Sequence, residues 1–485
     1  MTNEVSDDEI WSGLRRRFAV GERVVARRGP WQVRNPGPSV TVKRSTRFRT
    51  AGVGSIIGVG AAIVLVAVLL GPSSARPATA PKRSASPSVT QNAPTGTPAS
   101  GSMTSPYPPL SSSPKPQTAA GRTGQMTTLL PDGRVLIAGG QGGVKILASA
   151  TIYDPASGKL SPTGEMTSGR VHGTATLLAD GKVLVAGGYD SKDFLSSAEL
   201  YDAKTGRFSN TGQMTVTRAY QTATLLPNGH VLLVGGDGFS YDRLSSAELF
   251  DPSTGRFTAT GIMKVTQEVD TATLLANGSV LVTGSWFDQT GQPTYRPSAE
   301  IYDPRTGEFR VAGSMSVART DATATLLLNG KVLVAGGDDL SGFPIGSAEL
   351  YDAATNTFSS LQMTNPRAMF TATRLPDGRV LLAGGDSGTI QEGITVGTTS
   401  VEIYDPKSGT FAPSGPMVIG RSNQTATLLP NGRVLMVGGE ADIRGVGLLF
   451  PQPISTSDLS SLSSNEIYDP TTGTFTAAAS LTDAP

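Results

Sequence analysis

The chain has 485 residues, and its 40 basic and 39 acidic side chains leave a formal net charge of +1. This near balance argues against a nucleic-acid-binding protein, which usually carries a clear basic excess. The sequence has no cysteine, so disulfides, thiolate zinc sites and cysteine nucleophiles are excluded.

Residues 1–50 are basic, with eleven Lys or Arg against five acidic residues, and include Arg15–Arg17. We expect a cytoplasmic tail that is attracted to anionic lipid headgroups. The stretch DDEIWSGLRRRF has an alternative interpretation, as a short amphipathic helix that binds a partner protein.

Residues 51–71, AGVGSIIGVGAAIVLVAVLLG, contain no charged side chain. As a helix this segment would be about 30 Å long, which matches the hydrocarbon core of a bilayer. Basic residues just before it predict a cytoplasmic N-terminus and an extracytoplasmic remainder, anchored in the cell membrane by a single pass. A cleaved signal peptide is the alternative, with a candidate cleavage site at Ala78–Ala80, but its apolar core is normally shorter.

Residues 72–118 contain eleven prolines among 47 residues, and most of the others are Ser, Thr, Ala or Gly. Such a segment cannot bury enough apolar surface to fold. The composition predicts a disordered, extended linker between the membrane and the next domain.

Residues 119–485 repeat one unit seven times. A glycine that closes the second apolar segment marks each copy, and these glycines lie 48 to 54 residues apart, at Gly139, Gly187, Gly235, Gly284, Gly336, Gly384 and Gly438. Each copy also has an Asp-Gly or Asn-Gly pair, typical of a tight hairpin with positive φ at both positions. The period is that of a four-stranded unit.

The unit has four segments with strand character. A Thr-rich segment such as TATLL precedes the hairpin, and a continuous apolar run such as KVLVAGG follows it. A variable loop leads to SAELYD or a close copy, and a last segment carries an aromatic residue. Apolar runs of this kind indicate strands buried on both faces, so we predict an all-β domain.

This order of features resembles the kelch repeat over residues 122–481. The resemblance implies a seven-bladed β-propeller with one repeat in each blade. Two departures are Phe or Leu in place of the usual Trp of the fourth strand, and Gly284-Ser285 in place of Gly-Gly. Because the first unit begins with strand one and the last ends with strand four, we expect blade one to pack directly on blade seven.

The resemblance implies a ligand site on the loops of one face and around the central channel. Six arginines recur just before the first strand, at Arg122, Arg170, Arg218, Arg319, Arg367 and Arg421, with Gln267 in the fourth unit. One interpretation is a cationic ring that binds carboxylate or phosphate. The other is structural pairing with the glutamates of the third segment, Glu199, Glu248, Glu300, Glu349, Glu402 and Glu466. The two sets are not interrupted in the same unit. The first unit has Arg122 but Thr151 in place of the glutamate, and the fourth unit has Glu300 but Gln267 in place of the arginine.

Shortly after each arginine the sequence differs from one copy to the next, at His172, Tyr220, Gln221, Asp270, Asp321, Phe370, Asn423 and Gln424. Variation at the start of an inner strand is typical of a specific ligand site, and equally of drift at solvated positions. Trp286 and the apolar residues Leu448, Leu449 and Phe450 fall in the variable loops. These side chains either contact a sugar or a protein partner or pack beneath their own loops.

Galactose oxidase resembles this fold, and its copper site uses His pairs, Tyr ligands and a Tyr–Cys crosslink. Here there is no Cys and only His172 and His230, so we expect no copper-radical chemistry, no metal, no cofactor and no catalytic residue. Paired carboxylates such as Asp270 and Asp321 would allow hydrolysis if they lie close together, although their spacing gives no support for it.

The sequence therefore predicts a membrane-anchored extracytoplasmic propeller. Its predicted function is non-catalytic binding of a surface glycan, a cell-wall polymer or a protein. Two alternatives are a carbohydrate-active enzyme and a transmembrane sensor that signals through its N-terminal tail.

Overall fold

The structure, a computed structural model, describes residues 121–481 except 240–241, 265–266, 287–295, 340, 392–393 and 444–460. The expected tail, membrane helix and linker lie outside these residues. Within the described ranges no helix is long and apolar enough to cross a membrane.

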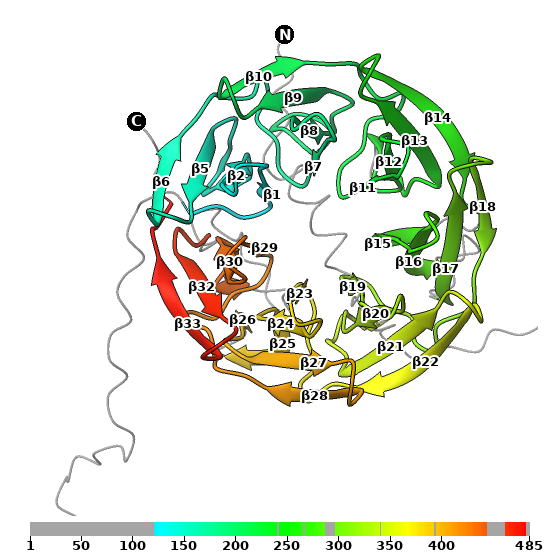
Figure 1. The fold of residues 1–485 in the computed structure, drawn as a ribbon, viewed down its shortest axis with the longest axis vertical. Coiled ribbons are helices and arrows are strands. Elements are labelled where there is room, and N and C mark those ends of the chain that lie inside the picture. The colour runs from blue at the N-terminus through cyan, green and yellow to red at the C-terminus, as the bar shows by residue number, and fades with distance from the viewer. Residues whose placement is uncertain are drawn as a thin grey trace, which may run out of the picture. The chain divides into compact units, whose positions relative to one another are not determined.

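The described residues form seven four-stranded antiparallel sheets, which surround a central opening and are numbered here as blades 1 to 7 in chain order (Figure 1). The innermost strands are β1 (Met126–Leu129), β7 (Thr174–Leu177), β11 (Thr222–Leu225), β15 (Gln267–Leu274), β19 (Thr323–Leu326), β23 (Thr371–Arg374) and β29 (Thr425–Leu428). The second strands are β2 (Val135–Ala138), β8 (Val183–Ala186), β12 (Val231–Val234), β16 (Val280–Trp286), β20 (Val332–Ala335), β24 (Val380–Ala383) and β30 (Val434–Val437).

The outer two strands of each blade complete the sheet. The third strands are β5 (Ala150–Asp154), β9 (Ala198–Asp202), β13 (Ser246–Asp251), β17 (Arg296–Asp303), β21 (Ser347–Asp352), β27 (Val401–Asp405) and β32 (Asn465–Asp469). The fourth strands are β6 (Lys159–Pro162), β10 (Arg207–Asn210), β14 (Arg256–Ile262), β18 (Glu308–Val311), β22 (Thr357–Gln362), β28 (Thr410–Pro413) and β33 (Thr474–Ala478). The predicted all-β propeller is confirmed, with one repeat in each blade.

The hairpins between the first and second strands differ in detail from the prediction. In blade 1, Gly133 N donates to the Leu130 carbonyl at 3.0 Å and Leu130 N donates to the Arg134 carbonyl at 2.8 Å. The loop therefore has three residues, and only Gly133 takes a positive φ, of 85°. Asp132 keeps a negative φ and accepts a hydrogen bond from Arg134 N at 3.0 Å, the local turn that Asp and Asn favour.

The core lies between the blades rather than within them. The second strands are completely buried, as in Val183–Ala186, because each one is covered by the neighbouring blade on both faces. In most blades the aromatic residue of the fourth strand packs on the tyrosine of the third, for example Phe208 on Tyr201 with ring centroids 4.8 Å apart. Each pair of adjacent blades encloses its own apolar cluster, to which both blades contribute.

Blade 1 packs directly on blade 7, as expected. Gly439 N of blade 7 donates to the Arg122 carbonyl of blade 1 at 3.0 Å. The same bond joins other neighbouring blades, for example Gly188 N to the Arg218 carbonyl at 2.9 Å. Leu481 completes the apolar cluster between the two terminal blades, so the ring closes without a shared blade.

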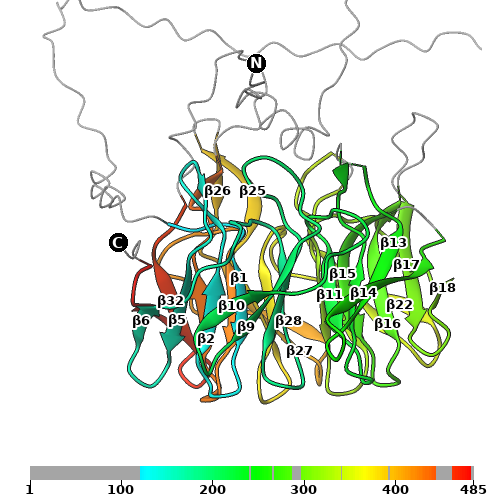
Figure 2. The same cartoon turned by 90° about the horizontal axis from the view of Figure 1, so that it is seen from above.

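Two small sheets decorate the loops after the second strands. One is the ribbon of β3 (Gln141–Gly142) and β4 (Lys145–Ile146). The other joins β25 (Asp386–Gln391) and β26 (Ile394–Gly397) of blade 6 to β31 (Asp442–Ile443) of blade 7, and Figure 2 shows β25 and β26 projecting from one face of the ring. We call this face the loop face.

Blade 4 departs from the others at the loop face. Where the glycine pair is replaced by Gly284-Ser285, the ladder continues, and Trp286 pairs with Gln267 on one side and Arg296 on the other. Trp286 therefore ends strand β16, and the prediction that it lies in a variable loop is wrong. The paired glycines elsewhere adopt positive φ, which ends the regular ladder.

Candidate functional site

The six arginines lie inside the blades, with exposed fractions of 0–1%. Five of them form buried ion pairs with a glutamate of the same blade, at 2.7 to 3.0 Å: Arg170–Glu199, Arg218–Glu248, Arg319–Glu349, Arg367–Glu402 and Arg421–Glu466. Burial lowers the pKa of these five guanidinium groups, and the paired glutamate opposes that shift.

Each arginine also joins the two ends of the variable loop. Arg170 Nη1 donates to the Gly187 and Ser197 carbonyls, at 2.8 and 3.1 Å. Arg122 makes the equivalent bonds to Gly139 and Ser149. Because these donors point into the blade, the arginines do not form a cationic ring at the channel, and the geometry favours their structural interpretation.

A ring of backbone positions lies two residues after these arginines, and we call it the collar. It comprises Gly124, His172, Tyr220, Asp321, Met369 and Asn423, together with Asp270 of blade 4. The five non-glycine members other than Asp270 have φ between 52° and 59°, a left-handed conformation that is uncommon outside glycine, asparagine and aspartate. All seven are partly exposed.

Hydrogen bonds run from blade to blade along the collar. His172 N donates to the Gly124 carbonyl at 3.0 Å, and Tyr220 N to the His172 carbonyl at 2.9 Å. On the other side, Asn423 N donates to the Met369 carbonyl at 3.0 Å. The left-handed backbone turns each N–H toward the preceding blade, which explains why this conformation recurs whatever the side chain.

Blade 4 contributes to the collar through a side chain. Its inner strand has a register shift between Val269 and Thr271, and Asp270 lies at this bulge. Asp270 Oδ1 accepts the hydrogen bond from Asp321 N at 3.1 Å, in place of the main-chain carbonyl used elsewhere.

The collar side chains are chemically diverse. The rings of His172 and Tyr220 stack with centroids 4.2 Å apart and an interplanar angle of 22°. Asp270 and Asp321 lie in blades 4 and 5, and Asn423 Nδ2 donates to Glu440 Oε2 at 3.5 Å in blade 7. Five of the residues singled out in the sequence come together on this ring, which carries an aromatic pair, an amide and carboxylates. The other three, Gln221, Phe370 and Gln424, follow the collar positions and are buried.

A second acidic feature was missed by sequence reasoning. The residue directly after the glycine pair is acidic in four blades, at Asp237, Asp338, Asp386 and Glu440, and we call these residues the acidic ring. Their backbones pair with the residue before the collar, as when Asp338 N donates to the Thr320 carbonyl at 2.7 Å. The signal was visible as a recurrent acid after Gly-Gly, but the loop there appeared merely variable.

The environment of three acidic-ring residues disfavours ionisation. Burial and the nearby Asp321, Asp386 and Asp339 carboxylates raise the pKa of Asp338 to about 8. Burial also raises the pKa of Asp386, and that of Glu440. The channel mouth is thus acidic and partly protonated near neutral pH, the opposite of the cationic mouth that the arginine column suggested.

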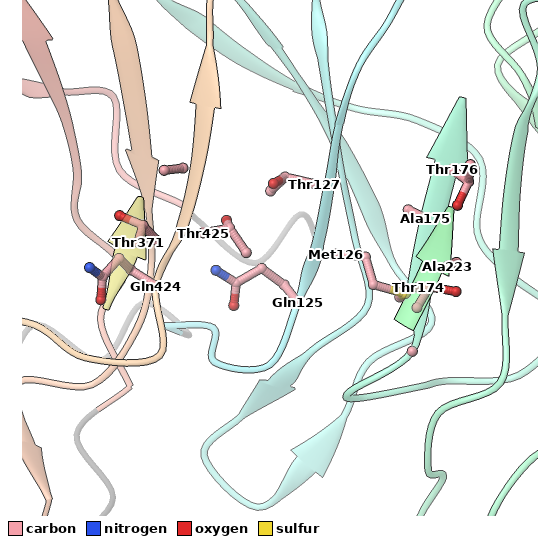
Figure 3. A pocket seen from close by; sticks show the side chains of 12 residues that line it. Gln125, Met126, Thr127, Thr174, Ala175, Thr176, Ala223, Thr371, Gln424 and Thr425 are labelled. Carbon is pink, nitrogen blue, oxygen red and sulfur yellow. The ribbon is translucent and has the colours of Figure 1, made fainter. Parts of the chain in front are cut away.

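Below the collar the channel contains a cavity of about 400 Å³, seen from close by in Figure 3. Its wall is formed by Gln125, Met126, Thr127, Gly173, Thr174, Ala175, Thr176, Ala223, Thr371, Gln424, Thr425 and Ala426. These residues belong to or directly precede the innermost strands, so the TATL segments line the channel as the resemblance implied.

The two histidines lie far apart in the fold. His172 is in the collar, whereas His230 follows the hairpin turn between β11 and β12, at the opposite end of the inner strands. His230 Nε2 lies 4.0 Å from Asp251 Oδ1. The two imidazoles therefore cannot ligate one ion.

Residues 170–215 match the Kelch motif. No curated protein matches the sequence. Among solved structures, a fungal alcohol oxidase of the AA5 family, in complex with copper, aligns with a TM-score of 0.53 and 17% identity, over 68% of this chain and 72% of that chain. At this identity the likeness shows the fold alone.

Among the described residues, no group of three or more His, Cys, Asp or Glu side chains is placed to hold a metal ion. The Kelch motif therefore matches one repeat, that of blade 2, and the described residues as a whole form a seven-bladed β-propeller.

Proposed function

We propose that this propeller is a membrane-anchored, extracytoplasmic binding module that holds a surface glycan or cell-wall polymer at the collar without altering it. The anchor is the apolar segment 51–71, which the basic residues before it orient with the N-terminus in the cytoplasm. Kelch propellers are commonly interaction modules, so a protein ligand is the alternative occupant of the same surface.

The collar carries this proposal. One backbone geometry recurs around the channel mouth in six of the seven blades, and in five of these it presents a different, partly exposed side chain. A scaffold that fixes the backbone and varies the side chains is the usual arrangement of a ligand site on rigid elements.

The chemistry of the collar fits a carbohydrate better than an anion. Carboxylates and the Asn423 amide accept hydrogen bonds from hydroxyl groups, and the stacked pair of His172 and Tyr220 offers an aromatic surface to a sugar ring. The six arginines that would attract an anion are buried, and five of them are paired with a glutamate.

The test is binding of the full chain to an array of glycans and cell-wall polymers, with Tyr220→Asn as the collar variant. Asparagine already occupies the equivalent position at Asn423 with φ of 55°, so the variant keeps the backbone and removes the aromatic ring. We expect saturable binding that Tyr220→Asn weakens about tenfold or more. His230→Asn, at the far end of the propeller, is the matched control and should bind as the wild type does.

One observation favours a second candidate, hydrolysis of a glycoside. A carboxyl that stays protonated near neutral pH beside an ionised one is the pair that glycosidases use as acid and nucleophile or base, and Asp338 lies near Asp321 and Asp386. Release of reducing ends from an array ligand, abolished by Asp338→Asn, would establish this function instead. Binding to purified protein partners, with no glycan bound, would favour the interaction-module alternative.

A further inference from the structure

We propose that the loop face docks on the surface of the membrane that anchors the chain. This inference rests on the proposed anchor and extends the proposed function, because it turns the collar toward the bilayer. The ligand of the collar would then be a glycan attached to a lipid of that membrane. The evidence is the distribution of exposed apolar side chains, their spacing, and the point at which the chain enters the propeller.

The exposed apolar side chains gather at one end of the propeller. Among the described residues, eight large apolar side chains are exposed, and seven of them lie in loop-face connections or at the strand ends that lead into these: Val144, Phe239, Ile262, Val311, Phe343, Val418 and Ile419. The eighth, Leu328, lies in the hairpin between β19 and β20, at the opposite end of the strands, which we call the far face. Single exposed apolar residues are ordinary, but this one-sided distribution is typical of a contact surface.

The far face is charged instead. Its turns carry exposed ion pairs in most blades, for example Arg134 with Asp132 at 2.7 Å and Arg305 with Asp303 at 3.0 Å. Charged groups lose their hydration at a large cost when they enter an apolar environment. The loop face is therefore the side of the propeller that is better suited to contact lipid.

Three of the apolar side chains lie in the loops that follow the second strands. They are Val144 in blade 1, Phe239 in blade 3 and Phe343 in blade 5, and they are 65%, 67% and 57% exposed. Because the blades follow one another around the ring (Figure 1), these side chains are spread around the channel mouth and do not form one patch. Separate contacts around a ring suit a broad, flat partner such as a bilayer, into whose headgroup region apolar side chains can insert. A protein partner usually buries one contiguous surface.

The chain enters the propeller on the loop face. Arg122 N donates to the Leu462 carbonyl at 3.1 Å, and Thr123 N donates to the Gln141 carbonyl at 3.0 Å. Leu462 and Gln141 both follow the second strand of their blade, so the predicted linker joins the propeller on the side of the apolar loops. A proline-rich linker of 47 residues spans roughly 150 Å at about 3.1 Å per residue. Either face can reach the bilayer at this length, and the apolar side chains decide which one contacts it.

Charge indicates which lipids suit the loop face. The acidic ring lies at the channel mouth, and its ionised carboxylates would repel anionic headgroups. The apolar side chains must therefore provide the contact, and a zwitterionic phosphatidylcholine bilayer should be sufficient.

The experiment uses the absence of cysteine, which allows a fluorophore to be attached at one chosen position. The full chain is reconstituted in phosphatidylcholine nanodiscs with a single labelled substitution, Val144→Cys, Phe239→Cys, Phe343→Cys or Leu328→Cys. Quenching is measured with a nitroxide-labelled lipid and, separately, with iodide in the water. Leu328→Cys is the matched control, because Leu328 is an equally large change on the far face and is 69% exposed.

We expect the lipid quencher to reduce the fluorescence at residues 144, 239 and 343 but not at residue 328, and iodide to do the reverse. In the chain labelled at residue 144, each of Phe239→Ser and Phe343→Ser should lower the ratio of docked to undocked chain about tenfold or more, the effect of one buried phenylalanine. Leu328→Ser should leave this ratio unchanged. A collar glycan should bind the anchored chain more tightly when attached to a lipid of the same disc than when free, and the two serine substitutions together should reduce this preference.

Four outcomes would overturn the docking. The first is equal lipid quenching at all four positions, and the second is the strongest lipid quenching at residue 328. The third is protection from iodide at residues 144, 239 and 343 without lipid quenching, which would assign the loop face to a second copy or another protein. The fourth is a chain that does not remain with the nanodiscs, which would overturn the anchor as well. Glycan binding in detergent solution that depends on Tyr220 would stand in each case, so the collar function can survive the failure of the docking.

Discussion

Replacing Glu402 by glutamine tests the structural role of the buried arginine column. Arg367 and Glu402 both have side-chain exposed fractions of 0%, and Arg367 Nη2 donates to Glu402 Oε1 at 2.9 Å. The same oxygen accepts from Asn365 N at 2.8 Å, and Oε2 accepts from Thr364 N at 2.9 Å. Three donors therefore face the carboxylate, two at Oε1 and one at Oε2.

Glu402→Gln keeps the shape of the side chain but loses the charge and one acceptor. The amide NH₂ must face at least one of these donors, which leaves a buried N–H unsatisfied at a cost of about 1–3 kcal/mol. The positive charge of Arg367 also loses its partner, and breaking a buried ion pair on one side typically costs about 3–5 kcal/mol in total. We expect a loss of this size in the free energy of unfolding.

The assay is denaturant unfolding of the full chain, followed by circular dichroism. The matched control is Asp377→Asn in the same blade, which breaks the pair between Arg379 and Asp377 at 2.6 Å, where the side chains are 37% and 48% exposed. Exposed pairs contribute less than about 1 kcal/mol, and asparagine occurs naturally at this turn position in other repeats. Equal, small losses for both variants would refute the structural role of the buried pair.

Two further predictions concern ring closure and the acidic mouth. Gly438→Ala places a methyl group against the Arg122 carbonyl and should lower the free energy of unfolding by more than about 3 kcal/mol. The control, Gly143→Ala, has nearly the same φ but nothing within 4 Å of the added methyl, so it should lose only about 1–2 kcal/mol through left-handed strain. Equal unfolding free energies for the two variants would contradict the tight contact between blades 7 and 1. Because the folded-state pKa of Asp338 is raised to about 8 from 3.8, the folded protein retains a proton that the unfolded chain releases, so wild-type stability falls as pH rises from about 4 to about 8. Asp338→Asn should remove this loss of stability. The free energy of unfolding of the variant should match that of the wild type near pH 4 and exceed it by up to about 6 kcal/mol near pH 8. Parallel curves of unfolding free energy from pH 4 to 9 would refute the buried acid.

Much of the fold follows from the repeat, because its hairpins, buried runs and recurrent glycines act at short range. The period predicted seven blades, and the order of segments predicted direct packing of blade 1 on blade 7. Local rules failed where one residue changed the backbone: Ser285 in the glycine position extends the ladder of blade 4 and draws Trp286 into a strand. The predicted positive φ of Asp132 is wrong, because its side chain accepts a hydrogen bond from Arg134 N and stabilises a turn with negative φ at this residue.

The candidate site was harder to predict because it depends on where side chains point. The collar residues were visible as variation after each arginine, but their shared left-handed backbone depends on hydrogen bonds to the neighbouring blade. A column of arginines has the same pattern in sequence whether it faces the channel or the interior. The raised pKa of Asp338 comes first from burial and then from Asp321 in its own blade and Asp386 in the next, and only the packing of neighbouring blades creates both.

The central claim is that the collar binds a ligand and leaves it unchanged. The most direct test is equilibrium dialysis of the full chain against its best array ligand, with mass spectrometry of the ligand after prolonged incubation. We expect one ligand bound per chain, an unchanged ligand mass, and weaker binding by Tyr220→Asn. A cleaved or oxidised ligand, or binding that does not depend on Tyr220, would contradict it.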